Sequence, residues 1–170
     1  NAASIQNIIT RVTGDRVSTI DGVLGAHGTA NLFLLNPNGI VFGENARLDI
    51  GGSFVGTTAD AVKFPDGRAY SATNPPDSLL SINVPMGLQF GSNPGAIAHR
   101  ATGETPSGRF GVAVQPGNRI AFLGGDLNID GGAITAPQGQ IDLGAIAGSG
   151  LVRILPESFD YGNIDEWGNI

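Results

Sequence analysis

The chain has 170 residues, which is short enough for one domain and long enough to bury a core. Apolar residues make up 41% of it, while glycine and proline, with 27 and 10 residues, stay below the share typical of low-complexity disorder. Nine basic and fifteen acidic side chains give a formal charge of −6 without a basic stripe, so we expect a folded protein that binds no nucleic acid.

Residue types that favour helices are scarce, since the sequence has one Lys, one Met and four Glu against eleven Asp and thirteen Asn. Asp and Asn favour turns and helix caps over helix interiors. The longest apolar run, at 32–35, is far shorter than the ~20 residues of a membrane helix, so we expect no insertion into a membrane. Cysteine is absent, which fits an exported domain without thiols. The composition predicts an all-β chain.

The predicted strands are short and separated by turn residues. Residues 4–12 favour a strand over one or two turns of helix, and 61–71 predict a hairpin around Pro-Asp-Gly. Two prolines predict a break at 73–77, and 92–109 predicts an exposed loop because it is poor in apolar residues. Apolar or alternating segments predict further strands at 31–35, 40–42, 46–50, 110–114 and 140–143.

An internal repeat indicates the architecture. The segment 38–52 contains Asn-Gly-Ile-Val-Phe and Leu-Asp-Ile-Gly-Gly, and 118–132 contains similar sequences at nearly the same spacing, with a looser copy at 140–144. Similar short strands that recur between Gly and Asn corners are typical of a β-solenoid. With roughly 20 residues per coil and ~4.8 Å between coils, the chain would form about eight coils and a stack of roughly 40 Å. A β-sandwich is the alternative, because its strands would have the same lengths.

The strongest local signal is a segment with the sequence Asn-Pro-Asn-Gly-Ile. Proline at the second and glycine at the fourth position predict a type I turn. The turn joins two strongly apolar segments, so it predicts a sharp corner. We expect its asparagine side chains to hydrogen-bond the backbone of their own or the adjacent coil. The residues that we single out as a secretion or structural motif are Asn36, Pro37, Asn38, Gly39 and Ile40.

Residues 28–43, which include this motif, resemble the signature of the filamentous haemagglutinin N-terminal domain. This is the secretion (TPS) domain of two-partner secretion TpsA exoproteins. The family's second motif, Asn-Pro-Asn-Leu, is missing, and we expect the capping segment with which the family's domain normally begins to be missing as well. The resemblance covers about residues 1–155, with further matching segments in the family's order at 11–14, 52–61, 124–132 and 136–144.

The resemblance implies a right-handed parallel β-helix (β-solenoid) with small extrahelical hairpins and loops. It implies a single domain over 1–170, of which 156–170 lie outside the resemblance. The implied function is the secretion signal of a large exported adhesin- or haemagglutinin-like exoprotein, and not an enzyme. The implied partner is a TpsB-type outer-membrane transporter, whose periplasmic POTRA domains would recognise the domain. The resemblance also implies a monomer that travels via the periplasm and is then secreted or on the cell surface.

Sequence patterns for catalysis, cofactors or metals are weak, and we expect no such site. Residues 126–131 resemble the first half of an EF-hand calcium loop, but Pro137 stands where the bidentate Glu would be. His27 and His99 have no His or Glu at metal-ligand spacing. We therefore expect both histidines at the surface or in loops.

Two other functions stay open from the sequence. A β-helical polysaccharide lyase or hydrolase could use the carboxylates of Asp126, Asp130 and Asp142 as acid and base. Carboxylates that alternate along strands are also typical of a solvated face. A glycan-binding module without catalysis is the second alternative.

Overall fold

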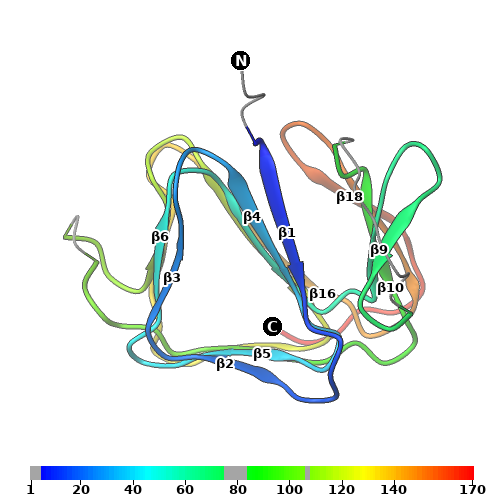
Figure 1. Ribbon diagram of the computed structural model, residues 1–170. Helices are drawn as coiled ribbons and strands as arrows, with labels where there is room; N and C mark the ends of the chain where they lie inside the picture. The colour runs from blue at the N-terminus through cyan, green and yellow to red at the C-terminus, as the bar shows by residue number, and fades with distance from the viewer. Residues whose placement is uncertain (1–4, 75–83, 106–107) are drawn as a thin grey trace.

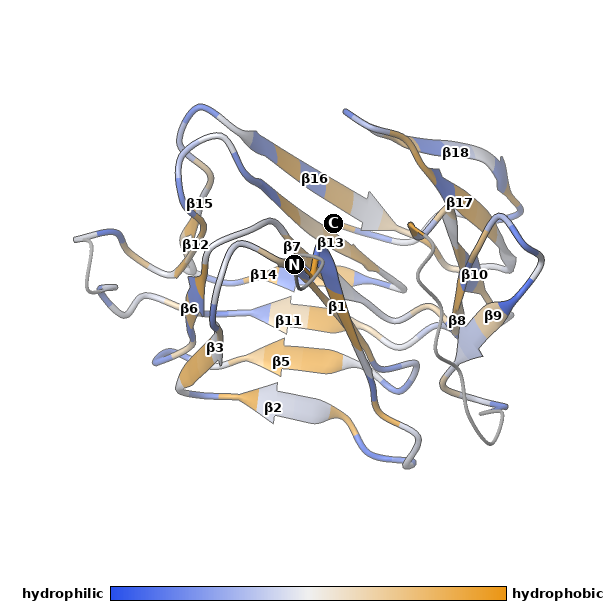
Figure 2. Cartoon of the chain, turned by 45° about the horizontal axis from the view of Figure 1, so that its top comes forward, coloured by the Kyte–Doolittle hydropathy of each residue, from blue (hydrophilic) through white to orange (hydrophobic). Residues whose placement is uncertain are grey.

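The computed structural model describes residues 5–74, 84–105 and 108–170, and this described part contains strands but no helix. Most strands are parallel and stack in columns, so that the chain winds into a triangular β-solenoid of about 5 turns (Figure 1). In Figures 1 and 2 the chain runs clockwise while it recedes from the viewer. The solenoid is therefore right-handed, and the predicted fold class is confirmed.

Each face of the solenoid is one column of strands. The first face carries β1 (Asn7–Arg11), β4 (Asn31–Leu35), β7 (Phe54–Thr57), β13 (Arg119–Gly124) and β16 (Gln140–Ala145). The second face carries β2 (Ser18–Ile20), β5 (Ile40–Phe42), β11 (Ile97–His99) and β14 (Leu127–Ile129). The third face carries β3 (Val23–Ala26), β6 (Arg47–Ile50), β12 (Val112–Ala113) and β15 (Ile134–Thr135), which pair as β3 with β6 and β12 with β15.

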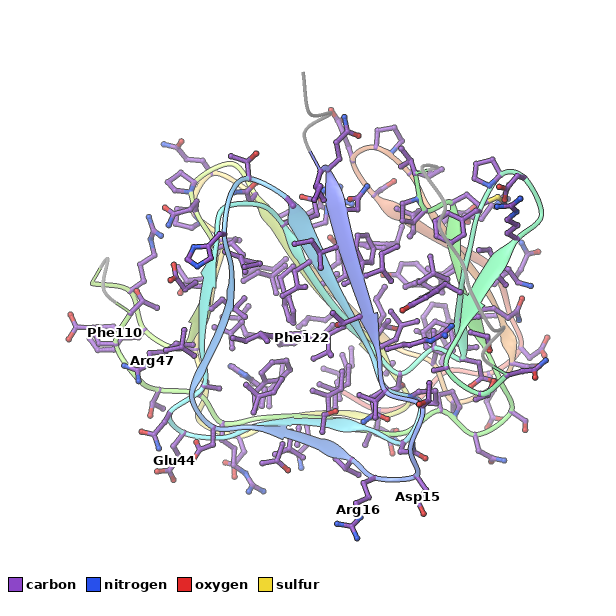
Figure 3. The ribbon with its side chains drawn as sticks, viewed as in Figure 1. Asp15, Arg16, Glu44, Arg47, Phe110 and Phe122 are labelled. Atoms are coloured by element: carbon purple, nitrogen blue, oxygen red, sulfur yellow. The ribbon has the colours of Figure 1, made fainter. Side chains whose placement is uncertain are left out.

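The three faces enclose a triangular prism. Alternate side chains of their strands point into this prism and form its core. Because the strands are in register, like positions stack along each column, as Ile40 does on Ile97. The rings of Phe42 and Phe122 stack with their centroids 5.0 Å apart, and Figure 3 shows Phe122 inside the prism. Full burial of each such side chain stabilises the fold by about 1.5–3 kcal/mol.

A second sheet, the outer sheet, lies outside the prism against the first face (Figures 1 and 2). Its antiparallel strands, in spatial order, are β18 (Phe159–Ile164), β17 (Gly150–Ile154), β10 (Gly87–Phe90), β8 (Ala61–Lys63) and β9 (Ala69–Ser71). Its apolar side packs on outward side chains of the first face, including Phe33, Leu35 and Leu123, in a second core. The first face is therefore buried on both sides, which explains the continuous apolar run at 32–35.

Two of the local predictions are confirmed. The segment 4–12 contains a strand, β1, and none of its described residues is helical. The hairpin consists of β8 and β9, and the amide N of Gly67 donates to the carbonyl O of Phe64 at 3.1 Å across its turn. The break expected at 73–77 lies partly outside the described residues, so only its first two positions can be followed.

Two expectations about the solenoid were wrong. The segment 92–109 is not simply an exposed loop, because β11 runs through it and Ile97 and His99 are almost or completely buried. The chain makes about 5 turns instead of eight. The reason is that β8, β9 and β10, and later β17 and β18, lie outside the prism and build the outer sheet, so they add no coils.

The internal repeat indicates a solenoid correctly but does not give its register. Ile40 stands on the second face, whereas its counterpart in the repeat, Ile120, stands on the first. The two copies therefore do not stack on each other, and Ile120 pairs instead with Phe54 of the preceding coil. Residues paired between directly connected coils of the first face are 21 to 24 positions apart, close to the expected coil length.

Candidate functional site

The predicted motif forms the corner between β4 and β5. The amide N of Gly39 donates to the carbonyl O of Asn36 at 3.0 Å, which closes a four-residue turn. Pro37 occupies the second position and Asn38 keeps a negative φ, so the turn is of type I, as the sequence predicts. Ile40, directly after the turn, is completely buried in the prism core.

Asn36 is completely buried, and its side-chain amide has a partner at every polar atom. Its Nδ2 donates to the carbonyl O of Arg16 and to Oγ of Ser18, both at 2.8 Å. Its Oδ1 accepts from the backbone N of Asn38 at 3.0 Å and from Nδ2 of the same residue at 3.2 Å. Its backbone N donates to the carbonyl O of Thr57 at 3.0 Å. One residue thus connects three successive coils.

Asn38 and Gly39 fit the same corner in different ways. Asn38 is exposed, and its Nδ2 reaches back to the carbonyl O of Gly14 in the first coil at 2.8 Å. Gly39 has a φ of +125°, and a Cβ at this position would lie 2.9 Å from the carbonyl O of Ala96 in the next coil. Both the backbone conformation and the close approach therefore favour glycine.

The carboxylates considered for a lyase or hydrolase lie at separate places. Asp126 is in the corner between β13 and β14, where its Oδ1 accepts from the backbone N of Asn169 at 2.8 Å. Asp130 follows β14 and pairs with Arg100, with Nε and Oδ2 3.7 Å apart. Asp142 belongs to β16 on the first face. Within the described ranges, no three His, Cys, Asp or Glu side chains gather where they could hold a metal ion.

The two histidines differ in position. His27 is exposed, as expected, but His99 is completely buried, and its expected surface position is wrong. Its Nε2 lies 3.0 Å from the carbonyl O of Ala133 and donates to it, while its buried Nδ1 has no hydrogen-bond partner in the described part of the chain. Burial lowers the pKa of His99, and the hydrogen bond to Ala133 opposes this effect. The signal available in the sequence was the alternation at 97–99, which puts His99 on the same side of its strand as the apolar Ile97.

A groove of about 740 Å³ that no sequence pattern predicted lies between the first face and the outer sheet. One side of it is a polar ladder across the first face, in which hydrogen bonds connect each coil to the next. The residues of this ladder are Asn7, Asn31, Ser53, Arg119 and Gln140. The first contact, from Nδ2 of Asn31 to Oδ1 of Asn7, is 2.9 Å long. No local pattern could reveal this groove, because its walls come from segments spread along the chain from Asn7 to Phe159.

Next to this groove lies a largely buried ion pair. Nε of Arg119 and Oδ2 of Asp142 are 3.4 Å apart, and the guanidinium carbon lies 5.3 Å from the ring centroid of Phe159. Burial raises the pKa of Asp142, while Arg119 and a hydrogen bond from Gln140 lower it. Burial, together with the nearby Asp142, raises the pKa of Tyr161 to about 12. The pair holds β13 to β16 beneath the outer sheet, which is a structural role.

Comparison with known proteins places the chain in a family. The family model of the TPS secretion domain matches residues 1–162. A search of curated proteins found no match. Among the described residues, no helix is long and apolar enough to cross a membrane. The TPS secretion domain is a family of secretion and not of catalysis, and it implies export by two-partner secretion with an outer-membrane transporter as partner. Because the match covers nearly the whole chain, this protein belongs to the TPS secretion domain family.

Proposed function

We propose that the domain is the secretion signal of a large exported adhesin- or haemagglutinin-like exoprotein. Its partner is a TpsB-type outer-membrane transporter, whose periplasmic POTRA domains bind it before translocation. The exoprotein crosses the periplasm and is then released or stays on the cell surface. The observation that carries this proposal is the family match over residues 1–162.

The motif of Asn36, Pro37, Asn38, Gly39 and Ile40 contributes to secretion mainly through the fold. Its contacts support this role: the turn joins two buried strands, and the amide of Asn36 is buried and fully hydrogen-bonded. Removing this amide breaks its hydrogen bonds and leaves a void at a completely buried position, and both effects destabilise the corner. A direct contact between these side chains and the transporter is the lesser effect.

Residues 1–170 act as one monomeric domain in this proposal. The first face belongs to both hydrophobic cores, so neither core can form without it. The outer sheet combines β8, β9 and β10 with the later β17 and β18. A shortened chain that ends before β17 would expose the apolar side of β10, so we expect it to aggregate or melt early. Light scattering of the whole chain measures its oligomeric state directly, and we expect a monomer.

The test is secretion in a host that carries the chain together with the transporter encoded beside its gene. We expect the chain outside the cell only when this transporter is present with its POTRA domains. The transporter of an unrelated two-partner system is the matched control and should not export the chain. Export that does not depend on the transporter would contradict the proposal. A panel of polysaccharides tests the two alternative functions, and cleavage or specific binding of one of them would favour an enzyme or a glycan-binding module.

A further inference from the structure

The first corner of the solenoid is longer than the equivalent corners of the second and fourth coils. Six residues, 12–17, join β1 to β2, whereas four join β4 to β5 and two join β13 to β14. Figure 1 shows this corner loop at the lower right, where it extends beyond the outline of the prism. The regular backbone bonds between coils stop at its ends, at the backbone N of Val12 and that of Ser18. The stacking of coils therefore leaves the middle of the loop without a backbone partner in the next coil.

The asparagines of the motif bind this middle part. Nδ2 of Asn38 donates to the carbonyl O of Gly14, and Nδ2 of Asn36 donates to the carbonyl O of Arg16, both at 2.8 Å. Asn36 is itself held in place by its burial and by its contact with Ser18. These two hydrogen bonds restrict the backbone of the loop before any partner arrives, which lowers the entropy cost of binding.

The loop presents three of its side chains to solvent. Asp15, Arg16 and Val17 are all exposed, and Val17 is 49% exposed although it is apolar. In Figure 3 the side chains of Asp15 and Arg16 point away from the prism. Neither forms a hydrogen bond or an ion pair with any residue that the structure describes, whereas Arg100, Arg119 and Arg153, for example, each pair with a carboxylate. A loop that is held at two backbone positions and carries unpaired charges beside an apolar residue is suited to a protein partner.

We propose that residues 13–17 are a contact surface for the periplasmic domains of the transporter, with Asn36 and Asn38 as positioning residues. The partner surface has a carboxylate opposite Arg16, a basic group opposite Asp15 and an apolar patch against Val17. This inference rests on the proposed function and names the part of the domain that the transporter contacts. It also explains how a motif that is partly buried could affect recognition, since it acts through the loop that it holds.

The test exchanges the two charges in the whole chain, as Asp15→Arg with Arg16→Asp. The net charge stays the same, and neither side chain has a partner to lose, so we expect an unchanged thermal midpoint. The affinity for the purified periplasmic domains of the transporter encoded beside the gene should fall at least about tenfold. The matched control exchanges an exposed ion pair on another corner, as Arg100→Asp with Asp130→Arg, and should bind like the wild type.

A second measurement tests whether Asn38 acts through the loop. If it does, Asn38→Ala combined with the charge exchange weakens binding no more than the exchange alone, in a double-mutant cycle. Fully additive losses would show that Asn38 acts elsewhere. Wild-type affinity in the charge-exchanged chain would overturn the proposed contact and leave the secretion function standing. A wild-type chain that the periplasmic domains do not bind would instead contradict the proposed function itself.

Discussion

The buried amide of Asn36 is the most sensitive point of the corner, and Asn36→Ala tests its role in stability. The substitution removes four hydrogen bonds, two donated by Nδ2 and two accepted by Oδ1. The carbonyl O of Arg16 loses its donor, and the backbone N of Asn38 loses its acceptor. Both residues are exposed, so water can replace part of these bonds, but it cannot restore the packing of the completely buried amide.

The expected loss follows from the number of bonds. A neutral hydrogen bond contributes about 0.5–1.5 kcal/mol net, and partial access of water favours the lower half of that range. Four bonds then give a decrease of about 2–4 kcal/mol in the free energy of unfolding. A domain of this size loses about 2–4 °C in its thermal midpoint for each kcal/mol, so the midpoint of Asn36→Ala should fall by about 4–16 °C.

The assay is thermal unfolding followed by circular dichroism, with two reference variants. Asn45→Ala is the matched control, because Asn45 is exposed and its side chain makes one long hydrogen bond, 3.4 Å to Oδ2 of Asp21. We expect it to change the free energy of unfolding by less than about 0.5 kcal/mol. Asn38→Ala removes two bonds at an exposed site and should fall between the two, at about 1 kcal/mol. If Asn36→Ala has the same thermal midpoint as Asn45→Ala, the structural account of the motif is refuted.

The motif's role in binding is measured on the same variants. Gly39→Val should be more destabilising than Asn38→Ala, because it puts a branched side chain at a φ of +125° and against the carbonyl O of Ala96. We expect loss of affinity for the transporter's periplasmic domains to accompany the loss of stability. A motif variant with wild-type melting but no binding would show that the motif acts on recognition apart from stability, and the double-mutant cycle with the charge exchange then separates a direct contact from an effect through the loop.

Three further predictions concern backbone strain, pH and metal ions. Gly117 and Gln138 occupy the same turn position in successive coils, with φ of +81° and 53°, where glycine is favoured. We therefore expect Gly117→Ala to lower the free energy of unfolding by about 0.5–1 kcal/mol and Gln138→Gly to raise it by a similar amount, as measured by chemical denaturation. Burial puts the pKa of His99 below its ordinary 6.5, so near and below this pH the unfolded chain binds more protons than the folded chain. The stability that neutral His99 contributes is therefore fully present above pH 6.5 and is lost as the pH falls below it. This loss should disappear in His99→Gln but persist in His27→Gln, and persistence in both would exclude His99 as its cause. Chelators should leave the thermal midpoint unchanged, because Pro137 replaces the calcium ligand, and a calcium-dependent shift of several degrees would contradict this.

Much of the fold was accessible from local patterns in the sequence. Turn chemistry acts over four residues, so the type I turn at Asn36 and the hairpin turn at Gly67 could be predicted without knowing what lies around them. Scarce helix formers and short apolar segments were enough for an all-β chain, and recurring Gly and Asn corners were enough for a solenoid. The resemblance to the TPS domain added the handedness and the extrahelical elements.

What the tertiary structure decided is which strands stack and what becomes buried. Strands of the outer sheet carry the same short apolar patterns as those of the prism, so the sequence overstated the number of coils. His99 is buried beside the rings of Phe42 and Phe122, whose centroids lie 6.0 and 5.6 Å from its own, and these residues are 57 and 23 positions away in the chain. The corner loop at 13–17 likewise depends on amides from the next coil. Local propensity determines strands and turns, whereas register between coils depends on contacts between distant segments, and those set burial, hydrogen-bond partners and the exposed surface.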